Sequence, residues 1–210
     1  MDAITTFFKQ GGFWMWPILG MSIVALAVML ERFYALFMTH NINAALFMEE
    51  IKKFVQTGDI TGAIRFCKNK EQSALARVVK EGLSRANRGP DQIQNAIEEA
   101  ALEVTPQITV RGTLLQNIAN IATLLGLLGT ILGLIDAFTA LAEISDPAQQ
   151  GKMLTKGISV AMNTTAFGLM VAIPALLSHV WLSGITKKIL DEIEHYSVKL
   201  ENLLVTRLQK

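Results

Sequence analysis

The stretch "LLGLLGTILGLIDAF" (124–138) decides the fold, because it is almost entirely apolar. It carries glycines at close intervals, one threonine at its centre and one aspartate near its end. With its flanks it extends over 118–141, which exceeds the ~20 residues that a helix needs to cross about 30 Å of hydrocarbon. The sequence therefore predicts a membrane-spanning helix, and the hydroxyl of Thr130 at its centre needs an explanation.

Two further apolar runs, 13–37 and 158–181, are also long enough to span a membrane. Trp14 and Trp16 at the start of the first run and Tyr34 near its end match the aromatic belts found at membrane interfaces. Only one lysine precedes this run and no small-x-small cleavage site follows it. We interpret it as a retained anchor rather than a cleaved signal peptide.

The composition fits membrane spans combined with a water-facing part. The chain has 210 residues, 51% of them hydrophobic and 18% charged, and its mean hydropathy is +0.37. The net charge of +1 gives no reason to expect a nucleic-acid partner. Cys67 is the only cysteine, so no disulfide can form within the chain. No zinc-ligand spacing, phosphate-binding loop or nucleophile–base pair is present, so we expect no metal, no cofactor and no enzymatic activity.

The segments outside the spans read as helices. The stretch "NINAALFMEEIKKFVQTGD" (41–59) has apolar residues at helical spacing, stops at Gly58 and offers Asp59 as the next cap. A later helix is expected to end at Gly89-Pro90, after which Asp91 caps a helix that continues into the second span. Beyond the third span an apolar stripe predicts a continuing amphipathic helix. The predicted fold is all-α, with three transmembrane helices whose extensions enter a helical domain.

Basic residues set the expected orientation through the positive-inside rule. The side predicted to be cytoplasmic carries Arg32, Arg111, Lys187 and Lys188. The opposite side carries the weaker set Lys9, Lys152 and Lys156. We therefore expect the N-terminus outside, and the C-terminus and the segment 38–113 in the cytoplasm.

Three threonines are the candidate functional side chains. Thr123 and Thr130 are seven residues apart and share one face of the second span. Thr165 lies about as far from the external loop as Thr130 does, so both fall near mid-membrane. Their hydroxyls could bind water or a carboxylate from another chain. The alternative is that each hydroxyl only donates to a carbonyl of its own helix.

Other polar residues of the spans allow similar alternatives. Apart from Glu31 at the water boundary of the first run, Asp136 is the only carboxylate within the apolar runs. It is either a proton relay or an interfacial acid in contact with water. The remaining polar side chains are expected to make hydrogen bonds between helices. They are Asn163, Thr164, Asn117 and Asn120.

Two motifs in order give a specific resemblance. "GLLGTILGLIDAF" (126–138) and "GISVAMNTTAFGLMVAIPA" (157–175) resemble the second- and third-span motifs of the MotA/TolQ/ExbB proton-channel family, in its three-span ExbB/TolQ branch. "LERFYAL" (30–36) is similar to the end of the first span of that branch. The resemblance implies a homopentamer in the bacterial inner membrane around a dimer of a small single-span partner similar to ExbD or TolR. It also implies that Thr130 and Thr165 face an intramembrane aspartate of that partner.

The implied function is a subunit of a motor that uses proton flow to drive work at the cell envelope, with a TonB/TolA-like protein as a further partner. Membrane lipids are expected beside the basic residues at the span ends. Three positions depart from the family pattern. Val160 stands where ExbB has a glutamate, Thr123 replaces a proline, and Asp136 replaces an asparagine or histidine. The alternatives are a scaffold that moves no ions and a stand-alone channel gated by Asp136.

The resemblance and the charge pattern together give a complete topology prediction. The predicted segments are a periplasmic N-terminal segment (1–12), transmembrane helices at 13–37, 114–141 and 157–184, a cytoplasmic helical domain (38–113), a periplasmic loop (142–156) and a cytoplasmic C-terminal helix (185–210).

Overall fold

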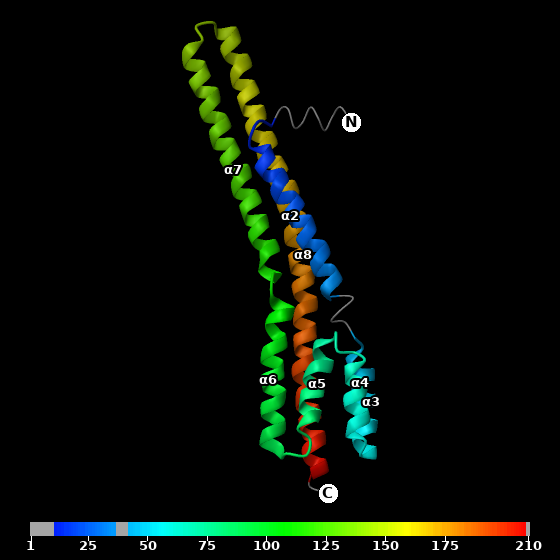
Figure 1. The fold of residues 1–210 in the computed structure, drawn as a ribbon. Coiled ribbons are helices and arrows are strands. Elements are labelled where there is room, and N and C mark those ends of the chain that lie inside the picture. Colours follow the sequence, from blue (N-terminus) through cyan, green and yellow to red (C-terminus); the bar gives the residue numbers. More distant parts are fainter. Residues whose placement is uncertain (1–10, 37–41, 209–210) are drawn as a thin grey trace. The chain divides into compact units, whose positions relative to one another are not determined.

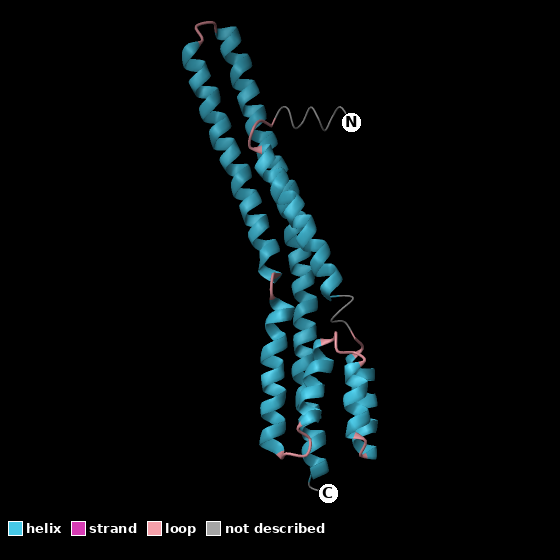
Figure 2. Ribbon diagram, in the orientation of Figure 1, coloured by secondary structure: helices cyan, strands magenta, loops and turns pink. Residues whose placement is uncertain are grey.

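The computed structural model describes residues 11–36 and 42–208, and no strand occurs within these residues. The chain folds into a succession of α-helices (Figures 1 and 2). They are α2 (Met15–Tyr34), α3 (Ala44–Thr57), α4 (Ile60–Lys68), α5 (Ala74–Ser84), α6 (Pro90–Thr109), α7 (Gly112–Glu143) and α8 (Pro147–Leu208). The all-α prediction is confirmed.

Three helical stretches are long and apolar enough to cross a membrane, as the sequence predicts. They lie in α2, in the region of α6 and α7, and in α8. The third is longer than a bilayer requires, because the 62 residues of α8 extend over about 93 Å at ~1.5 Å per residue. It continues through Pro174 without interruption, which confirms the expected helical extension beyond the third span.

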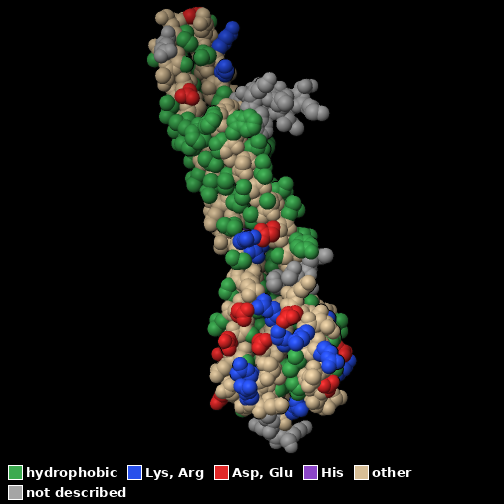
Figure 3. All heavy atoms as spheres, in the orientation of Figure 1, with side chains coloured by type: hydrophobic (Ala, Val, Ile, Leu, Met, Phe, Trp, Pro, Cys, Tyr) green, Lys and Arg blue, Asp and Glu red, His purple; other side chains and the backbone are tan. Residues whose placement is uncertain are grey.

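One compact unit consists of residues 1–31 and 111–180 and contains α2, α7 and the first part of α8. Its core is made of small and branched apolar residues, including Ile18, Ala25, Ala122, Val171 and Ala175. On the face drawn in Figure 3, hydrophobic side chains form a broad band over this unit. Such a band is what lipid-facing helices require, because lipid tails solvate apolar side chains outside a core.

The second compact unit consists of residues 32–110 and 181–210 and contains α3 to α6 and the last part of α8. Local chemistry defines its short helices. The Asn43 side chain accepts a hydrogen bond from Leu46 N at the start of α3, and Gly58 ends α3 with a φ of 84°. The Asp59 side chain accepts from Gly62 N at 2.8 Å and caps α4, as predicted.

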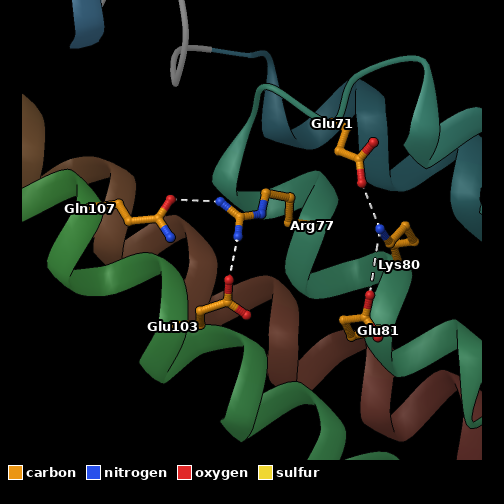
Figure 4. A network of polar contacts seen from close by, with 6 residues as sticks. All are labelled: Glu71, Arg77, Lys80, Glu81, Glu103 and Gln107. Carbon is orange, nitrogen blue, oxygen red and sulfur yellow. Dashed lines mark hydrogen bonds and ion pairs between the residues drawn. The ribbon is translucent and has the colours of Figure 1, made fainter.

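Polar contacts fix α5 within this unit (Figure 4). The Arg77 guanidinium donates to Gln107 Oε1 at 2.6 Å and to Glu103 Oε1 at 2.7 Å, both on α6. Lys80 Nζ lies 2.6 Å from Glu71 Oε1. This hydrogen bond raises the pKa of Lys80 and lowers the pKa of Glu71. The network ties α5 both to α6 and to the segment that precedes α5.

Three predictions about helix boundaries were wrong. The third of the short helices ends at Ser84 rather than at Gly89-Pro90, and Asp91 lies in the first turn of α6 rather than at its cap. Pro90 opens α6 because its fixed φ suits a first helical position. The helix that was expected to run on into the second span is interrupted at Arg111, whose left-handed φ of 61° separates α6 from α7.

Candidate functional site

Small residues bring α7 and α8 into close contact in antiparallel order. A Cβ added to Gly168 would lie 2.8 Å from the carbonyl oxygen of Ala122, and one added to Gly157 would lie 2.2 Å from Ala137 Cβ. Contacts this short leave room only for hydrogen at these positions. Close backbone approach through small residues is the usual way in which membrane helices associate.

Thr164 joins this contact to the segment that leads into α2. Its side chain is buried, and its hydroxyl lies 2.9 Å from the carbonyl oxygens of Gly11 and Val160, donating to one at a time. Gly12 lies next to Val160, four residues earlier on the same face of α8. The side of α8 that carries Thr164 is therefore the side covered by α2.

Thr165, one residue later, makes a different bond. Its hydroxyl donates to the carbonyl oxygen of Gly126 on α7 at 3.0 Å. The side chain is half-buried, and its oxygen keeps acceptor capacity while it donates.

Thr130 and Thr123 satisfy their donors within α7. The Thr130 hydroxyl donates to Leu127 O at 2.6 Å, and the Thr123 hydroxyl donates to Ala119 O at 3.0 Å. These bonds are those of the alternative in which a buried threonine back-bonds to its own helix. They still leave both oxygens free to accept a hydrogen bond.

Helix geometry puts the three threonines on one side of the α7–α8 pair. Gly129 and Thr164 face each other, since a Cβ on Gly129 would lie 2.3 Å from Thr164 Cγ2. Successive residues of a helix are rotated by about 100° around its axis. When two antiparallel helices face each other, one step along each chain turns the two side chains toward the same side of the helix pair. Thr130 and Thr165 follow Gly129 and Thr164 by one residue each, so they turn together, away from the side of Thr164.

We call Thr123, Thr130 and Thr165 the threonine surface. It lies on the side of the helix pair opposite α2, because α2 packs against the α8 face that carries Thr164 and Val171. Ile158 and Leu169, on the same α8 face as Thr165, are exposed. The threonine surface is thus an apolar strip with three hydroxyls on the side away from α2, exposed at Thr123 and half-buried at Thr130 and Thr165.

The other predicted polar residues do not join this surface. Asp136 is exposed and follows Thr130 by six residues, so it lies about 9 Å along α7 and is rotated by about 120°. Asn117 and Asn120 are exposed, and Asn163 is half-buried on the far side of Thr164 from Thr165. Among residues 11–36 and 42–208, no group of three or more His, Cys, Asp or Glu side chains could hold a metal ion.

Two contacts at the other end of this unit were not anticipated from the sequence. Arg111 forms an ion pair with Glu31. Glu31 lies in α2 and is the last residue of the segment 1–31 of this unit. His179 Nδ1 lies 2.8 Å from the carbonyl oxygen of Gly112, which can only accept, so this nitrogen carries the proton. Opposite charges at two span ends were the available signal for the ion pair. No feature of the sequence indicated the contact between His179 and Gly112.

Comparisons with known proteins agree with the spans and their motifs. A sequence model described as the MotA/TolQ/ExbB proton channel family matches residues 70–195. An ExbB-like biopolymer transport protein from Synechocystis is 34% identical over 167 residues, which cover 80% of this chain and 79% of that protein. A biopolymer transport protein of the ExbB type from Vibrio cholerae is 28% identical over 93% of this chain and 86% of its own length. The Tol-Pal system protein TolQ from Haemophilus influenzae is 31% identical over 54% of this chain and 48% of its own length.

Proposed function

The chain belongs to the MotA/TolQ/ExbB proton channel family, and on this premise we propose that it is the multi-span subunit of a proton-driven motor in the bacterial inner membrane. Family membership makes it a multi-pass membrane subunit of energy-transducing complexes, a class of proton channel proteins rather than enzymes. In the proposal several copies, five by resemblance, form a ring. The ring encloses the membrane anchors of a small single-span partner similar to ExbD or TolR, and a TonB/TolA-like protein receives the work.

The single observation that carries the proposal is the threonine surface. A helix pair that turns three hydroxyls away from its own α2 has an apolar strip with weak polar groups available to another chain. Thr123, Thr130 and Thr165 supply oxygens that accept a hydrogen bond from a protonated carboxyl. No described residue on this strip carries a charge that could titrate in its place.

The proposed mechanism follows from the cost of burying charge. A bare carboxylate is unstable in an apolar sleeve, so the partner's acid is neutral where only leucine and isoleucine face it. Beside the threonine surface the neutral acid donates a hydrogen bond to a threonine oxygen. Where water reaches it, the charged form is less costly and the proton can leave. Alternation between these two environments couples proton transfer to movement of the partner against the ring.

The test is to replace Thr130 by valine, which keeps the shape and removes the hydroxyl. The Thr130 donor bonds within its own helix, so Thr130→Val should leave folding and assembly intact. Loss of one hydrogen bond from the neutral acid is worth about 1 kcal/mol, so proton flux in liposomes that also hold the partner should fall by about fivefold. Thr165→Val should lower flux as well, with some loss of stability because the hydrogen bond from Thr165 on α8 to Gly126 O on α7 is lost.

Thr139→Val is the matched control. Thr139 lies on α7, is exposed and donates to Ile135 O at 2.9 Å, as Thr130 donates to a carbonyl of the same helix. Nine residues separate it from Thr130, so it points to the opposite side of the helix. Proton flux in liposomes with the Thr139→Val variant should equal that of the wild type. Equal flux in Thr130→Val, Thr165→Val and Thr139→Val would remove the threonine surface from the proton path.

A scaffold that moves no ions is the second candidate, because the own-helix bonds of Thr123 and Thr130 are those of packing residues. It predicts that all three valine variants assemble normally and that partner-containing liposomes show no flux above empty liposomes. The hypothesis of a stand-alone channel gated by Asp136 has less support, since Asp136 is turned about 120° from Thr130. Asp136→Asn should therefore leave partner-dependent flux unchanged.

A further inference from the structure

A groove with basic side chains runs between α3 and the last turns of α8. It encloses about 740 Å³, and the residues that matter here are Met48, Lys52, Val55, Tyr196, Lys199 and Arg207. The methionine and valine give it an apolar wall, while three cations face one carboxylate, that of Glu49. Lys199 Nζ lies 5.3 Å from the centre of the Tyr196 ring, so its charge is held over the groove rim. The groove suits an elongated acidic occupant.

The outer face of α6 has the complementary charge. Asp91 and Glu98 are exposed and seven residues apart, so they lie on one face of the helix. This acidic face is opposite the buried stripe of α6, which includes Ile93, Ile97 and Ala100. The Glu98 carboxylate accepts a hydrogen bond from Gln94 Nε2 at 2.9 Å, a contact that leaves its other oxygen available.

The acids of α6 and the cations of the groove lie at matching heights along the helix axes, and we call such a height a level. Ile97 and Leu200 both contact the position of a Gly82 Cβ, at 2.7 Å and 3.0 Å, so they mark one level on α6 and α8. From this level, Glu98 is one residue further along α6 and Lys199 is one residue back along α8. Asp91 is six residues back and Arg207 is seven residues on, which are ~9 Å and ~10.5 Å at about 1.5 Å per residue. The two acids of this face, Glu98 and Asp91, therefore each share their level with a cation of the groove.

We infer that the acidic face of α6 from a second copy of this chain docks in the α3–α8 groove, with Glu98 beside Lys199 and Asp91 beside Arg207. The inference rests on the ring proposed above. Copies around an axis parallel to these helices keep every residue at its level, so levels that match within one copy also match between neighbours. A contact between two different faces of the same chain closes into a ring when the rotation closes.

Lipid headgroups are a poor fit for this groove. Lys199 lies 15 residues beyond the predicted end of the third span at 184, and α8 is continuous over this stretch. At ~1.5 Å per residue this is about 22 Å along the helix axis. The complementary acids with matching spacing are instead present on every neighbouring copy.

Chemical cross-linking tests the inference. Glu98→Cys and Lys199→Cys are combined in the full chain with Cys67→Ala, and membranes are treated with a short bis-maleimide, since an ion pair between long side chains keeps Cα atoms beyond disulfide reach. We expect a ladder of cross-linked copies on a denaturing gel.

A second cysteine pair, Asp91→Cys with Thr206→Cys, tests the role of charge. Adding Lys199→Glu to this pair should weaken the ladder by about fivefold, because Glu98 and the new glutamate repel each other. Glu98→Lys in the same chain should restore it.

Val198→Cys paired with Glu98→Cys is the matched control. Val198 is exposed and adjacent to Lys199 but turned by about 100°, so it should cross-link much less. An equal ladder from both pairs would overturn the docking register. A complex whose mass in mild detergent is that of a ring, but which gives no ladder with either pair, overturns the inference and leaves the ring standing. Capture of a different protein by Lys199→Cys assigns the groove to that partner, and a monomer in detergent and in membranes overturns both the inference and the ring.

Discussion

Adjacent residues of α8 have different surroundings although their side chains are the same. Thr164 is buried and within hydrogen-bond distance of Gly11 O, so it fixes the start of α2 against α8. Thr165 turns by about 100° to the other side and bonds α7 instead. Removing the Thr164 hydroxyl breaks its bond to Gly11 O. Removing the Thr165 hydroxyl breaks its bond to Gly126 O, a carbonyl inside α7 that keeps the backbone hydrogen bond of its own helix. Only Thr165 lies on the surface proposed to meet a partner. A change in flux without a change in assembly is therefore expected from Thr165 and not from Thr164.

Cys67 should be unreactive in the folded protein. Burial raises the pKa of its thiol from 9.0 to about 12, and the thiolate is the reactive form. At pH 8 the thiolate fraction is then about a thousandth of that of an ordinary cysteine. Because the pKa is raised, the neutral thiol is favoured in the fold, and the stability that burial gives is complete below pH 9 and is lost as the pH rises toward 12.

Maleimide labelling followed by mass measurement checks this prediction. The native protein at pH 8 should stay unlabelled over a time in which the protein unfolded in detergent and urea is labelled completely. Rapid labelling of the native protein would mean that α4 opens readily and that Cys67 is not shielded by the fold.

At the scale of single helices, contacts between α7 and α8 depend on glycines that leave no room for a methyl group. Gly168→Ala puts a Cβ 2.8 Å from Ala122 O, a backbone atom that cannot move alone. Forcing two packed helices apart costs about 1–3 kcal/mol, more than the ~0.5–1 kcal/mol that alanine gains over glycine in a helix. The variant should therefore unfold at a lower temperature in detergent than the wild type.

Gly151→Ala is the control for that variant, because Gly151 is also in α8 and a Cβ there would meet nothing within 4 Å. It should keep or slightly raise the unfolding temperature. If Gly151→Ala and Gly168→Ala change the unfolding temperature equally, close contact between α7 and α8 does not hold this unit together.

The sequence predicted those parts of the fold that depend on local chemistry. Hydropathy located the three spans, and Gly58 and Asp59 located a helix end and the next helix start, because left-handed glycine and an aspartate cap are properties of a few neighbouring residues. The break at Arg111 was missed because arginine rarely adopts a positive φ, and its ion pair joins residues 80 apart in sequence. Helical rotation predicted that Thr123 and Thr130 share a face. It could not predict that α2 covers the opposite side, since that depends on tertiary contacts.

For the whole molecule, the distribution of charge decides which parts face which compartment. The unit that contains α3 to α6 carries ion pairs and exposed acids and bases, which a bilayer does not solvate. The chain passes between this unit and the apolar helices at three points, 31/32, 110/111 and 180/181, and Arg32 and Arg111 lie at the first two. From the positive-inside rule we propose that this unit is cytoplasmic and that the short turn between α7 and α8 is external.

Labelling of single cysteines in intact cells tests this orientation. Ser145, in the turn after α7, and Ser84, at the end of α5, are both exposed, so cysteine is accessible at either position. In a Cys67→Ala chain, a membrane-impermeant maleimide should label Ser145→Cys once the outer envelope is opened, and should label Ser84→Cys only after the inner membrane is broken. The reverse pattern would invert the topology. An inverted topology would put the groove of Lys199 and Arg207 outside the cytoplasm and the weaker basic set inside, contrary to the charge rule from which the orientation was inferred.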